Sequence, residues 1–364
     1  MHKVCILLVV FLLCSTAYCC STFCLIDGEQ VICGRNMDFH VDGGVIIVCP
    51  KGIAKISMPP NGNMDTPGQI QWTSRYSSLT FNFAARELPA SGINECGLVV
   101  NEMTLTETVY PPEDNRPALI PLQWIQYQLD CCATVEEVLA TDETIRVTGF
   151  SAFEGRGHHF LVSDSSGASA TIEFIDGKRV VHRGNPLQPP ALTNNTYRDS
   201  SDYLSQHFSF GGDQPIRLGP ASKDRFVCLA EKMRRYELVK DHVDIVHYGF
   251  ESLGHVAAGK STVWSIVYDA TNQQVYYRTA SDPRIRKIDA KRLFNESQDA
   301  KMLSIDGGLA GDVTGSFVGY TTERNLEYIK QFFIKFNQGK ELNDEQRFLA
   351  EELSIYPESF NEYD

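Results

Sequence analysis

The stretch that decides the fold of this chain is Cys20-Ser-Thr-Phe-Cys-Leu-Ile-Asp-Gly-Glu-Gln-Val-Ile-Cys-Gly-Arg-Asn-Met-Asp38. It reads as two short strands joined by a tight turn at Gly28-Glu29, because apolar and β-branched residues flank a dipeptide suited to a turn. A two-residue turn there predicts that Cys24 faces Cys33 across the two strands. These two cysteines are the only candidate disulfide pair that local geometry identifies, and the pattern of the remaining cysteines stays open.

The same register gathers reactive groups on one face of the hairpin. It predicts that Thr22 faces Arg35, and strand alternation then puts the Cys20 side chain on the face that carries Arg35. A guanidinium beside a thiol favours the thiolate. Asp38 follows shortly after, where its carboxylate can hold an ammonium group. The alternative is a pair of structural strands with an Arg and an Asp on the surface.

Residues 1–19 have the pattern of an export signal. Lys3 precedes an apolar run at residues 4–13, and Ala17 and Cys19 occupy the −3 and −1 positions of a cleavage site before Cys20. The apolar run is too short to span a membrane as a helix. We therefore expect an exported protein, periplasmic or secreted, in a compartment that permits disulfides.

Cleavage before Cys20 would give this residue a free α-amino group, whose ordinary pKa is near 8. Such an amine can take the proton of its own thiol and act as a general base. The working hypothesis is an N-terminal nucleophile hydrolase. Three alternatives stay open: cleavage between Ala17 and Tyr18, a lipid anchor on Cys19 or Cys20, and Cys20 as an ordinary disulfide partner.

Composition narrows the class of partner. The chain has 33 basic and 46 acidic residues and a formal net charge of −13, which argues against nucleic acid and anionic membranes. No second apolar stretch reaches membrane length, so we expect no membrane insertion once the signal is removed. The sequence contains neither Cys-x-x-Cys nor His-x-x-x-His, and we expect no metal and no cofactor.

Strands come in antiparallel hairpins, and helices cluster between two groups of strands. This order favours sheets covered by helices over alternating βαβ units. A strand is expected at 71–81, and His158-His159 is expected to face solvent at the start of another. Helices are expected from Pro121, after Thr134, at 196–208, at 222–253 with a break near Asp241, at Glu323–Phe336 and at Asp344–Leu353.

Several motifs, taken in order, resemble the choloylglycine hydrolase family, which includes conjugated bile acid hydrolases and penicillin V acylases. The resemblance covers roughly residues 20 to 290. The motifs are Cys20-Ser-Thr-Phe, Gly34-Arg-Asn-Met-Asp-Phe39, Gly92-Ile-Asn-Glu-Cys-Gly-Leu98, Leu192-Thr-Asn-Asn195, Asp224-Arg-Phe-Val227, Thr262-x-Trp and Val275-Tyr-Tyr-Arg.

The resemblance implies an α+β fold, a four-layer αββα sandwich of two antiparallel sheets flanked by helices. It implies hydrolysis of a linear, small-molecule acyl amide through an acyl-enzyme, without a cofactor, in a possible homo-oligomer. Cys20 would be nucleophile and base, with Arg35 and Asp38 beside it. Asn194 would contact the oxyanion through its side-chain amide, and Arg225 would favour the thiolate.

Some residues have other interpretations, and one departs from the family. Asn194 begins an Asn-Asn-Thr sequon, so a glycosylated surface loop is an alternative. Arg225 fits the polar face of a helix equally well. Thr104 stands where many members of the family carry an Asn or Tyr, so we expect it to contact the substrate but cannot infer which substrate.

The expected domain organisation is a signal at residues 1–19, a hydrolase domain at 20–295 and a partly helical extension at 296–364 packed on the same domain. The sequence assigns no function to the extension. Conjugated bile acids, phenoxyacetyl β-lactams, N-acyl homoserine lactones and N-acyl amines all remain as substrates. A catalytically inactive secreted binding protein on the same scaffold is the competing hypothesis.

Overall fold

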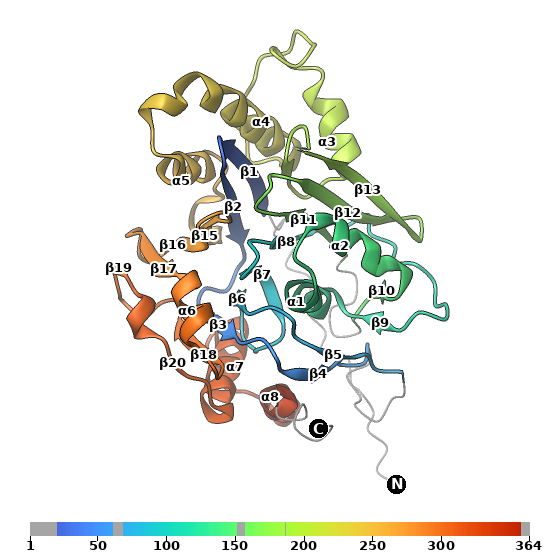
Figure 1. Cartoon of the computed structure of the whole chain (residues 1–364), viewed down its shortest axis with the longest axis vertical. Helices are drawn as coiled ribbons and strands as arrows, with labels where there is room; N and C mark the ends of the chain where they lie inside the picture. The colour runs from blue at the N-terminus through green and yellow to red at the C-terminus, as the bar shows by residue number, and fades with distance from the viewer. Residues whose placement is uncertain (1–19, 61–67, 151–156, 186, 358–364) are drawn as a thin grey trace.

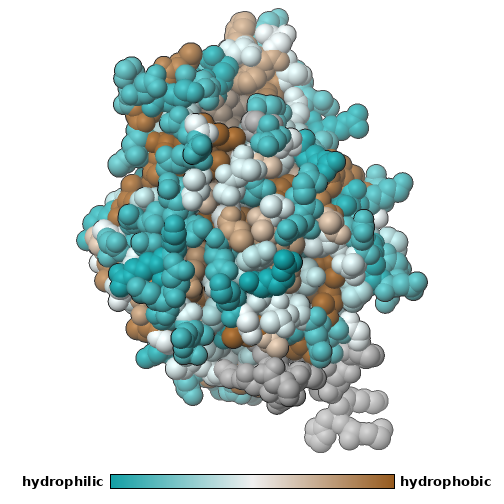
Figure 2. Space-filling model, viewed as in Figure 1, coloured by the Kyte–Doolittle hydropathy of each residue, from teal (hydrophilic) through white to brown (hydrophobic). Residues whose placement is uncertain are grey.

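The structure is a computed structural model that describes residues 20–60, 68–150, 157–185 and 187–357. The signal expected at residues 1–19 lies outside this part of the chain. Within the described ranges, no helix combines the length and the apolar character that a bilayer crossing requires. Figure 2 shows hydrophilic side chains over most of the face in view, with hydrophobic ones scattered between them.

Two large, mostly antiparallel sheets form the centre of the molecule. The seven-stranded sheet has the order β14 (Ala191–Leu192), β1 (Ser21–Asp27), β2 (Gln30–Asp38), β15 (Thr262–Asp269), β16 (Gln274–Thr279), β17 (Arg286–Asp289) and β19 (Gly311–Asp312). The nine-stranded sheet has the order β13 (Lys178–Gly184), β12 (Ser169–Ile175), β11 (His158–Ser163), β8 (Val99–Thr104), β7 (Pro89–Asn94), β6 (Ser78–Asn82), β3 (Val45–Cys49), β18 (Lys301–Ser304) and β20 (Val318–Gly319). Two small sheets pair β4 (Ala54–Ile56) with β5 (Gln71–Thr73) and β9 (Ala118–Leu119) with β10 (Arg146–Val147).

Helices cover the outer faces of both sheets, as Figure 1 shows. Helices α4 and α5 pack on the seven-stranded sheet over β1, β2 and β15, whereas α1 packs on β7 and β8 of the other sheet. This is the expected αββα sandwich. The helices are α1 (Pro121–Cys131), α2 (Val135–Ala140), α3 (Tyr197–Leu204), α4 (Ser222–Val239), α5 (Ile245–His255), α6 (Ala290–Glu296), α7 (Thr322–Phe336) and α8 (Asp344–Ile355).

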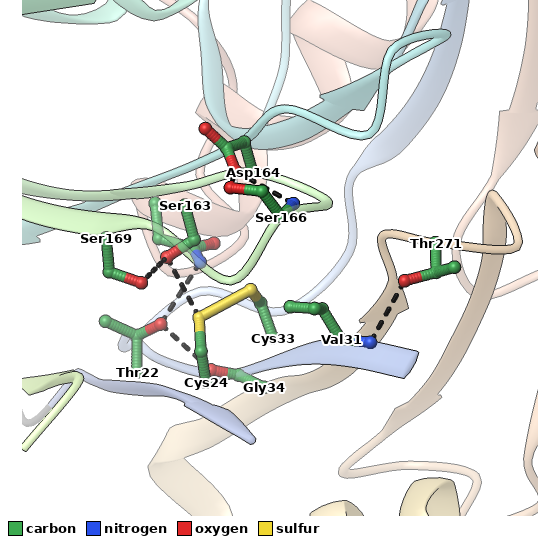
Figure 3. The surroundings of a disulfide bond; sticks show 11 residues. Thr22, Cys24, Val31, Cys33, Gly34, Ser163, Asp164, Ser166, Ser169 and Thr271 are labelled. Atoms are coloured by element: carbon green, nitrogen blue, oxygen red, sulfur yellow. Dashed lines mark hydrogen bonds between the residues drawn. A yellow bond between two sulfur atoms is a disulfide. The ribbon is translucent and has the colours of Figure 1, made fainter. Parts of the chain in front are cut away.

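The β1–β2 hairpin has the predicted register. Cys24 pairs with Cys33, Thr22 pairs with Arg35, and the disulfide between the two cysteines is formed (Figure 3). Gly28 occupies the turn at a φ of 59°, a conformation that favours glycine. The face with Thr22 meets the nine-stranded sheet, where the side-chain amide of Asn101 donates to the Thr22 hydroxyl at 3.1 Å. The hairpin therefore presents its reactive face to the space between the sheets.

The expected helices are confirmed. Pro121 stands in the first turn of α1, and the Thr134 side chain caps α2 by accepting from the Glu137 backbone N–H. The break expected near Asp241 falls in a short 3-10 turn at Lys240–His242 between α4 and α5. The residues that mark these helix ends act on their immediate neighbours, so the helices start and break close to where the sequence predicts.

Two strand predictions need correction. The stretch 71–81 is not one strand, because β5 and β6 belong to different sheets and are separated by a bend. His158 and His159 do not face solvent: 9% and 0% of their surfaces are exposed. His159 is fixed between the Glu173 carboxylate at 3.0 Å and the Thr193 carbonyl at 2.7 Å. Each nitrogen of this buried ring therefore has a hydrogen-bond partner.

The nine-stranded sheet continues beyond residue 296. Strand β18 pairs with β3, with Met302 opposite Ile47, and β20 pairs with β18. Met302 is buried with Ile47 and Cys49 in one apolar cluster against which Tyr328 of α7 packs. The segment beyond residue 296 thus contributes β18 and β20 to the nine-stranded sheet.

The disulfide gives a test of the hairpin. Replacing both Cys24 and Cys33 with serine should lower the free energy of unfolding by about 2–3 kcal/mol, because the unfolded chain regains the freedom of a short loop. Chemical denaturation measures this difference. The matched control, Cys131→Ser, removes a half-buried free thiol and should change stability far less; equal effects of the two changes would contradict a stabilising disulfide.

Candidate active site

Cys20 immediately precedes β1, and its side chain is almost fully buried, with 3% of its surface exposed. Its Sγ lies 3.7 Å from Met37 Sδ and 4.0 Å from the Asp38 backbone oxygen. The thiol also lines a cavity between the body of the fold and the C-terminal helices. The nucleophile inferred from the sequence thus lies at an internal surface.

Arg225, in the first turn of α4, connects three parts of the site. Its Nη1 donates to the Cys20 carbonyl and to the Ser21 hydroxyl, both at 2.6 Å, and its Nη2 donates to Asn194 Oδ1 at 2.9 Å. Arg225 is 2% exposed, so the alternative of a solvated helix face is wrong. A guanidinium suits this task because its rigid, planar set of donors can bind several acceptors at once.

Asn194 points into the protein. Its side-chain amide nitrogen donates to the Thr104 carbonyl at 2.9 Å, and its backbone N–H donates to the Ser222 hydroxyl at 2.8 Å. With both ends of its side chain bound within the fold, Asn194 does not fit the alternative of a glycosylated loop. Thr104 itself lines the cavity beside Cys20.

Asp38 carries an uncompensated oxygen. Its Oδ1 accepts from the Thr262 hydroxyl, whereas its buried Oδ2 has no hydrogen-bond partner among the described residues. Burial raises the pKa of the Asp38 carboxyl to about 6, against the opposing effects of the Thr262 hydrogen bond and of Arg225 and Arg35. A buried carboxylate oxygen without a partner is rare and calls for a cationic or donor group.

Arg35 begins a chain of polar contacts through Glu102 to His158 that the sequence did not predict. Its Nη2 lies 3.1 Å from Glu102 Oε2, and the other oxygen of Glu102 lies 2.6 Å from His158 Nδ1. Although burial opposes it, contact with His158 and Arg35 holds the pKa of Glu102 at about 2. The available signal was an acidic residue, Glu102, inside a strand that otherwise reads as buried.

The thiol is not activated in the uncleaved chain. Burial, the largest effect, raises the pKa of Cys20 to about 12; Arg35 opposes this, while Glu102 and Asp38 add to it. The expected influence of Arg35 therefore has the predicted direction but is outweighed. All five predicted residues still converge: Cys20, Arg35 and Asp38 on one hairpin, with Asn194 and Arg225 closing the other side.

Within the described residues, no group of three or more His, Cys, Asp or Glu side chains is arranged to hold a metal ion. The αββα sandwich, with a buried cysteine ahead of its first strand, is the fold of the N-terminal nucleophile hydrolases. The chain belongs to the choloylglycine hydrolase family of linear amide C-N hydrolases, whose model matches residues 19–209. It is therefore a hydrolase that acts on carbon–nitrogen bonds in linear amides, and its relatives imply a small-molecule substrate.

Relatives support this assignment. The penicillin V acylase of Pectobacterium atrosepticum is 30% identical over 293 residues, which cover 68% of this chain and 77% of that protein. The structure of penicillin V acylase from Agrobacterium tumefaciens is similar at a TM-score of 0.71, with 27% identity, over 83% of this chain and 98% of the other. A variant of conjugated bile acid hydrolase from Clostridium perfringens shares the fold at a TM-score of 0.65 and 19% identity, over 78% and 96%.

The orphan oxygen of Asp38 predicts a pH dependence. In a chain that carries extra residues before Cys20, stability should fall by up to about 3 kcal/mol as pH rises from 4 to 6, because the folded state keeps the Asp38 proton to about 6. The unfolded chain releases that proton near its ordinary pKa of 3.8. Denaturation at each pH measures the effect, and Asp38→Asn should remove it.

The chain with extra residues before Cys20 is compared with a chain that begins at Cys20. Its ammonium group next to Asp38 would stabilise the carboxylate, so this component of the pH dependence should shrink. Identical pH profiles for the extended chain and for its Asp38→Asn variant would contradict the assignment of the raised pKa to this carboxyl.

Proposed function

We propose that this protein is an exported amidase that uses Cys20 as an N-terminal nucleophile. Its substrate would be an amide of the kind that penicillin V acylases cleave. The single observation that carries this proposal is the buried Oδ2 of Asp38, which has no hydrogen-bond partner among the described residues, beside a buried thiol. An α-ammonium group on Cys20 would supply the missing donor and positive charge. Removal of residues 1–19 is the step that would create that group.

Processing would change the chemistry of the thiol as well as that of Asp38. In the uncleaved chain the Cys20 nitrogen is a peptide nitrogen without basicity. After cleavage it becomes an amine that can accept the thiol proton, so thiolate and ammonium form together on one residue. Asp38 then holds the ammonium, and Arg225, already bonded to the Cys20 carbonyl at 2.6 Å, fixes the orientation of the new terminus.

The proposed reaction has two halves. The Cys20 sulfur attacks the amide carbonyl carbon and the carbonyl oxygen gains negative charge. Asn194 would contact that oxygen through the side-chain N–H that does not bind the Thr104 carbonyl. The C–N bond then breaks, the leaving nitrogen takes the proton held on the α-amine, and a thioester remains. Water, deprotonated by the same amine, attacks the thioester and releases the acid with the free thiol.

The relatives suggest which amides to try first. Penicillin V acylases stand among both the sequence relatives and the structural neighbours, and a conjugated bile acid hydrolase shares the fold. Penicillin V, conjugated bile salts and N-acyl homoserine lactones therefore form the initial panel, with release of the free amine as the readout. Thr104 lines the cavity, which supports the proposal that it contacts the substrate.

The decisive experiment joins processing to activity. Mass spectrometry of the native protein should give a mature chain that begins at Cys20. The Cys20→Ser variant should lose at least ~1,000-fold in amine release, as expected when the nucleophile of an acyl-enzyme mechanism is removed. The matched control Cys96→Ser changes a half-buried thiol outside the site and should retain activity.

Each competing hypothesis has its own outcome. A mature chain that begins elsewhere, or full activity in Cys20→Ser, contradicts the mechanism. Correct processing with no amine released from any member of the panel, together with slow and uniform iodoacetamide labelling of all thiols, favours a binding protein on the same scaffold. Partitioning of the native protein into detergent favours a lipid anchor at Cys19 or Cys20.

A further inference from the structure

The C-terminal helices take part in the cavity beside Cys20. The cavity volume is about 170 Å³, and its walls are almost wholly apolar. Helices α7 and α8, which the sequence analysis left without a function, supply one wall. Their contribution is Phe332, Phe333 and Phe336 from α7 with Gln346, Leu349 and Leu353 from α8. These spacings place the side chains of each helix on one face.

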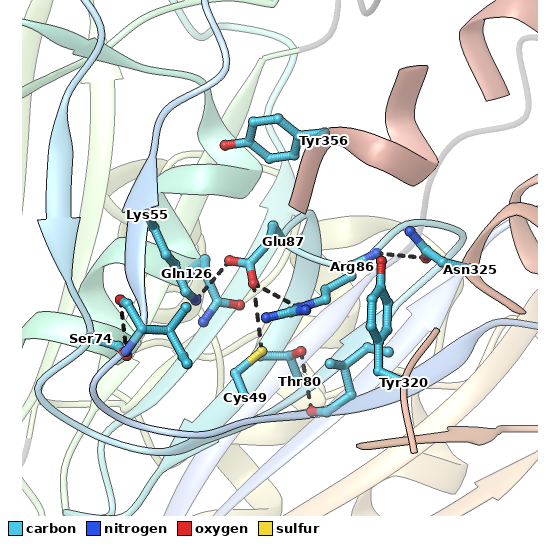
Figure 4. A network of polar contacts seen from close by, with 12 residues as sticks. Cys49, Lys55, Ser74, Thr80, Arg86, Glu87, Gln126, Tyr320, Asn325 and Tyr356 are labelled. Atoms are coloured by element: carbon cyan, nitrogen blue, oxygen red, sulfur yellow. Dashed lines mark hydrogen bonds and ion pairs between the residues drawn. The ribbon is translucent and has the colours of Figure 1, made fainter. Parts of the chain in front are cut away.

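The two helices are held firmly on the body of the fold. The Arg86 backbone N–H donates to the Asn325 side-chain oxygen at 3.2 Å, and Asn325 is fully buried (Figure 4). Near the end of α7, Lys335 Nζ lies 2.9 Å from Asp42 Oδ1. Tyr356, just after α8, is buried, and its hydroxyl donates to the backbone of β4. This wall is therefore fixed at both ends.

Aromatic contacts join α7 directly to the catalytic hairpin. Phe39 follows Asp38 in sequence, and its ring centroid lies 4.6 Å from that of Phe83 and 6.4 Å from that of Phe332. The rings of Phe83 and Phe332 are 6.1 Å apart. These separations are typical of favourable aromatic packing. A group that enters the cavity from Cys20 thus meets rings from the hairpin and from α7 together.

The volume of the cavity and the nature of its lining residues limit which groups it can bind. A cavity of about 150 Å³ lined by Leu, Ile and Phe is known to hold a benzene ring, so this one has room for a group of similar volume. Among the described residues, six phenylalanines line it: Phe39, Phe83, Phe150, Phe332, Phe333 and Phe336. Glu102 of β8 also lines the cavity, but its carboxylate is already paired with Arg35 and His158. No Lys or Arg is among the described residues that line the cavity, so an anionic acyl group buried there would lack a partner.

We propose that α7 and α8 form the acyl-selecting wall of the substrate site, so that the enzyme prefers amides with an uncharged, apolar acyl group about the volume of one aromatic ring. This inference rests on the proposed function, because it places the scissile carbonyl at Cys20 and the acyl group in the cavity. The C-terminal extension is then part of the site, and Leu349 and Phe332 are residues that determine specificity.

Neighbouring positions on α8 provide a matched test. Leu349 lines the cavity, whereas Phe348 next to it is 56% exposed and does not. The probes are amides of one amine with straight acyl chains of graded length, together with the phenylacetyl and phenoxyacetyl members. Two quantities are measured for each variant: kcat/KM in the active enzyme, and Kd by calorimetry in the Cys20→Ser background.

The expected shifts have opposite signs. Leu349→Ala should move the preferred acyl chain to a longer member, and Leu349→Phe should move it to a shorter one. Each ratio between neighbouring chain lengths should change by about 10-fold or more, the effect of one methylene in an apolar pocket. Phe348→Ala should leave the order of preference unchanged. Loss of folding cannot imitate two shifts in opposite directions.

A charged acyl group provides an independent test of the same proposal. A glutaryl amide should be a far poorer ligand than the pentanoyl amide of equal chain length. An equal response to both acyl groups in the parent protein would overturn the preference for an uncharged acyl group.

The outcomes separate this inference from the proposed function. Turnover with a chain-length preference that Leu349 variants do not move overturns the acyl wall and leaves the Cys20 mechanism standing. Graded binding in the Cys20→Ser background that Leu349 variants do move supports the wall, even if no amide is cleaved. Absence of binding by every member of the series overturns it.

Discussion

The hydrogen-bonded register between β1 and β2 is the constraint on which the site depends. It sets Thr22 opposite Arg35 and is fixed by the left-handed turn at Gly28 and by the disulfide next to it. Because side chains alternate, a slip of one residue would send Arg35 to the helices and Asn36 to the space between the sheets. In the observed register Asn36 instead donates to the Leu253 carbonyl of α5.

The same register determines which of the buried charged side chains near the hairpin have a partner of opposite charge. Arg35 faces the ionised Glu102, which faces His158 in turn, so one guanidinium is already compensated inside an apolar region. Arg225 donates to the Cys20 carbonyl, the Ser21 hydroxyl and Asn194 Oδ1, and one oxygen of the Asp38 carboxylate has no hydrogen-bond partner among the described residues. Leaving a buried charge unpaired is costly. The uncleaved site is thus organised to receive one more cation, and the α-amine of Cys20 is the group that chain cleavage would create there.

Features of the fold that depend on neighbouring residues could be predicted from the sequence. The pairing of Cys24 with Cys33, the start of α1 at Pro121 and the break after α4 depend on turns and caps that neighbouring residues determine. The roles of Glu102 and His158 were missed because they depend on which strands become neighbours. That β8 lies beside β11 is a property of the whole sheet, which neither strand encodes alone. The C-terminal helices were located correctly, but their place beside Cys20 is equally a tertiary property.

The central claim is that the Cys20 sulfur, beside its own free amine, carries the acyl group during turnover. Rapid mixing with an excess of a cleaved amide, followed by acid quench and peptide mass mapping, tests it most directly. The account predicts an acyl adduct on a peptide whose first residue is Cys20, formed and lost at rates that match turnover. Turnover with an adduct on another residue, or on a Cys20 that still follows residue 19 in the chain, would contradict it.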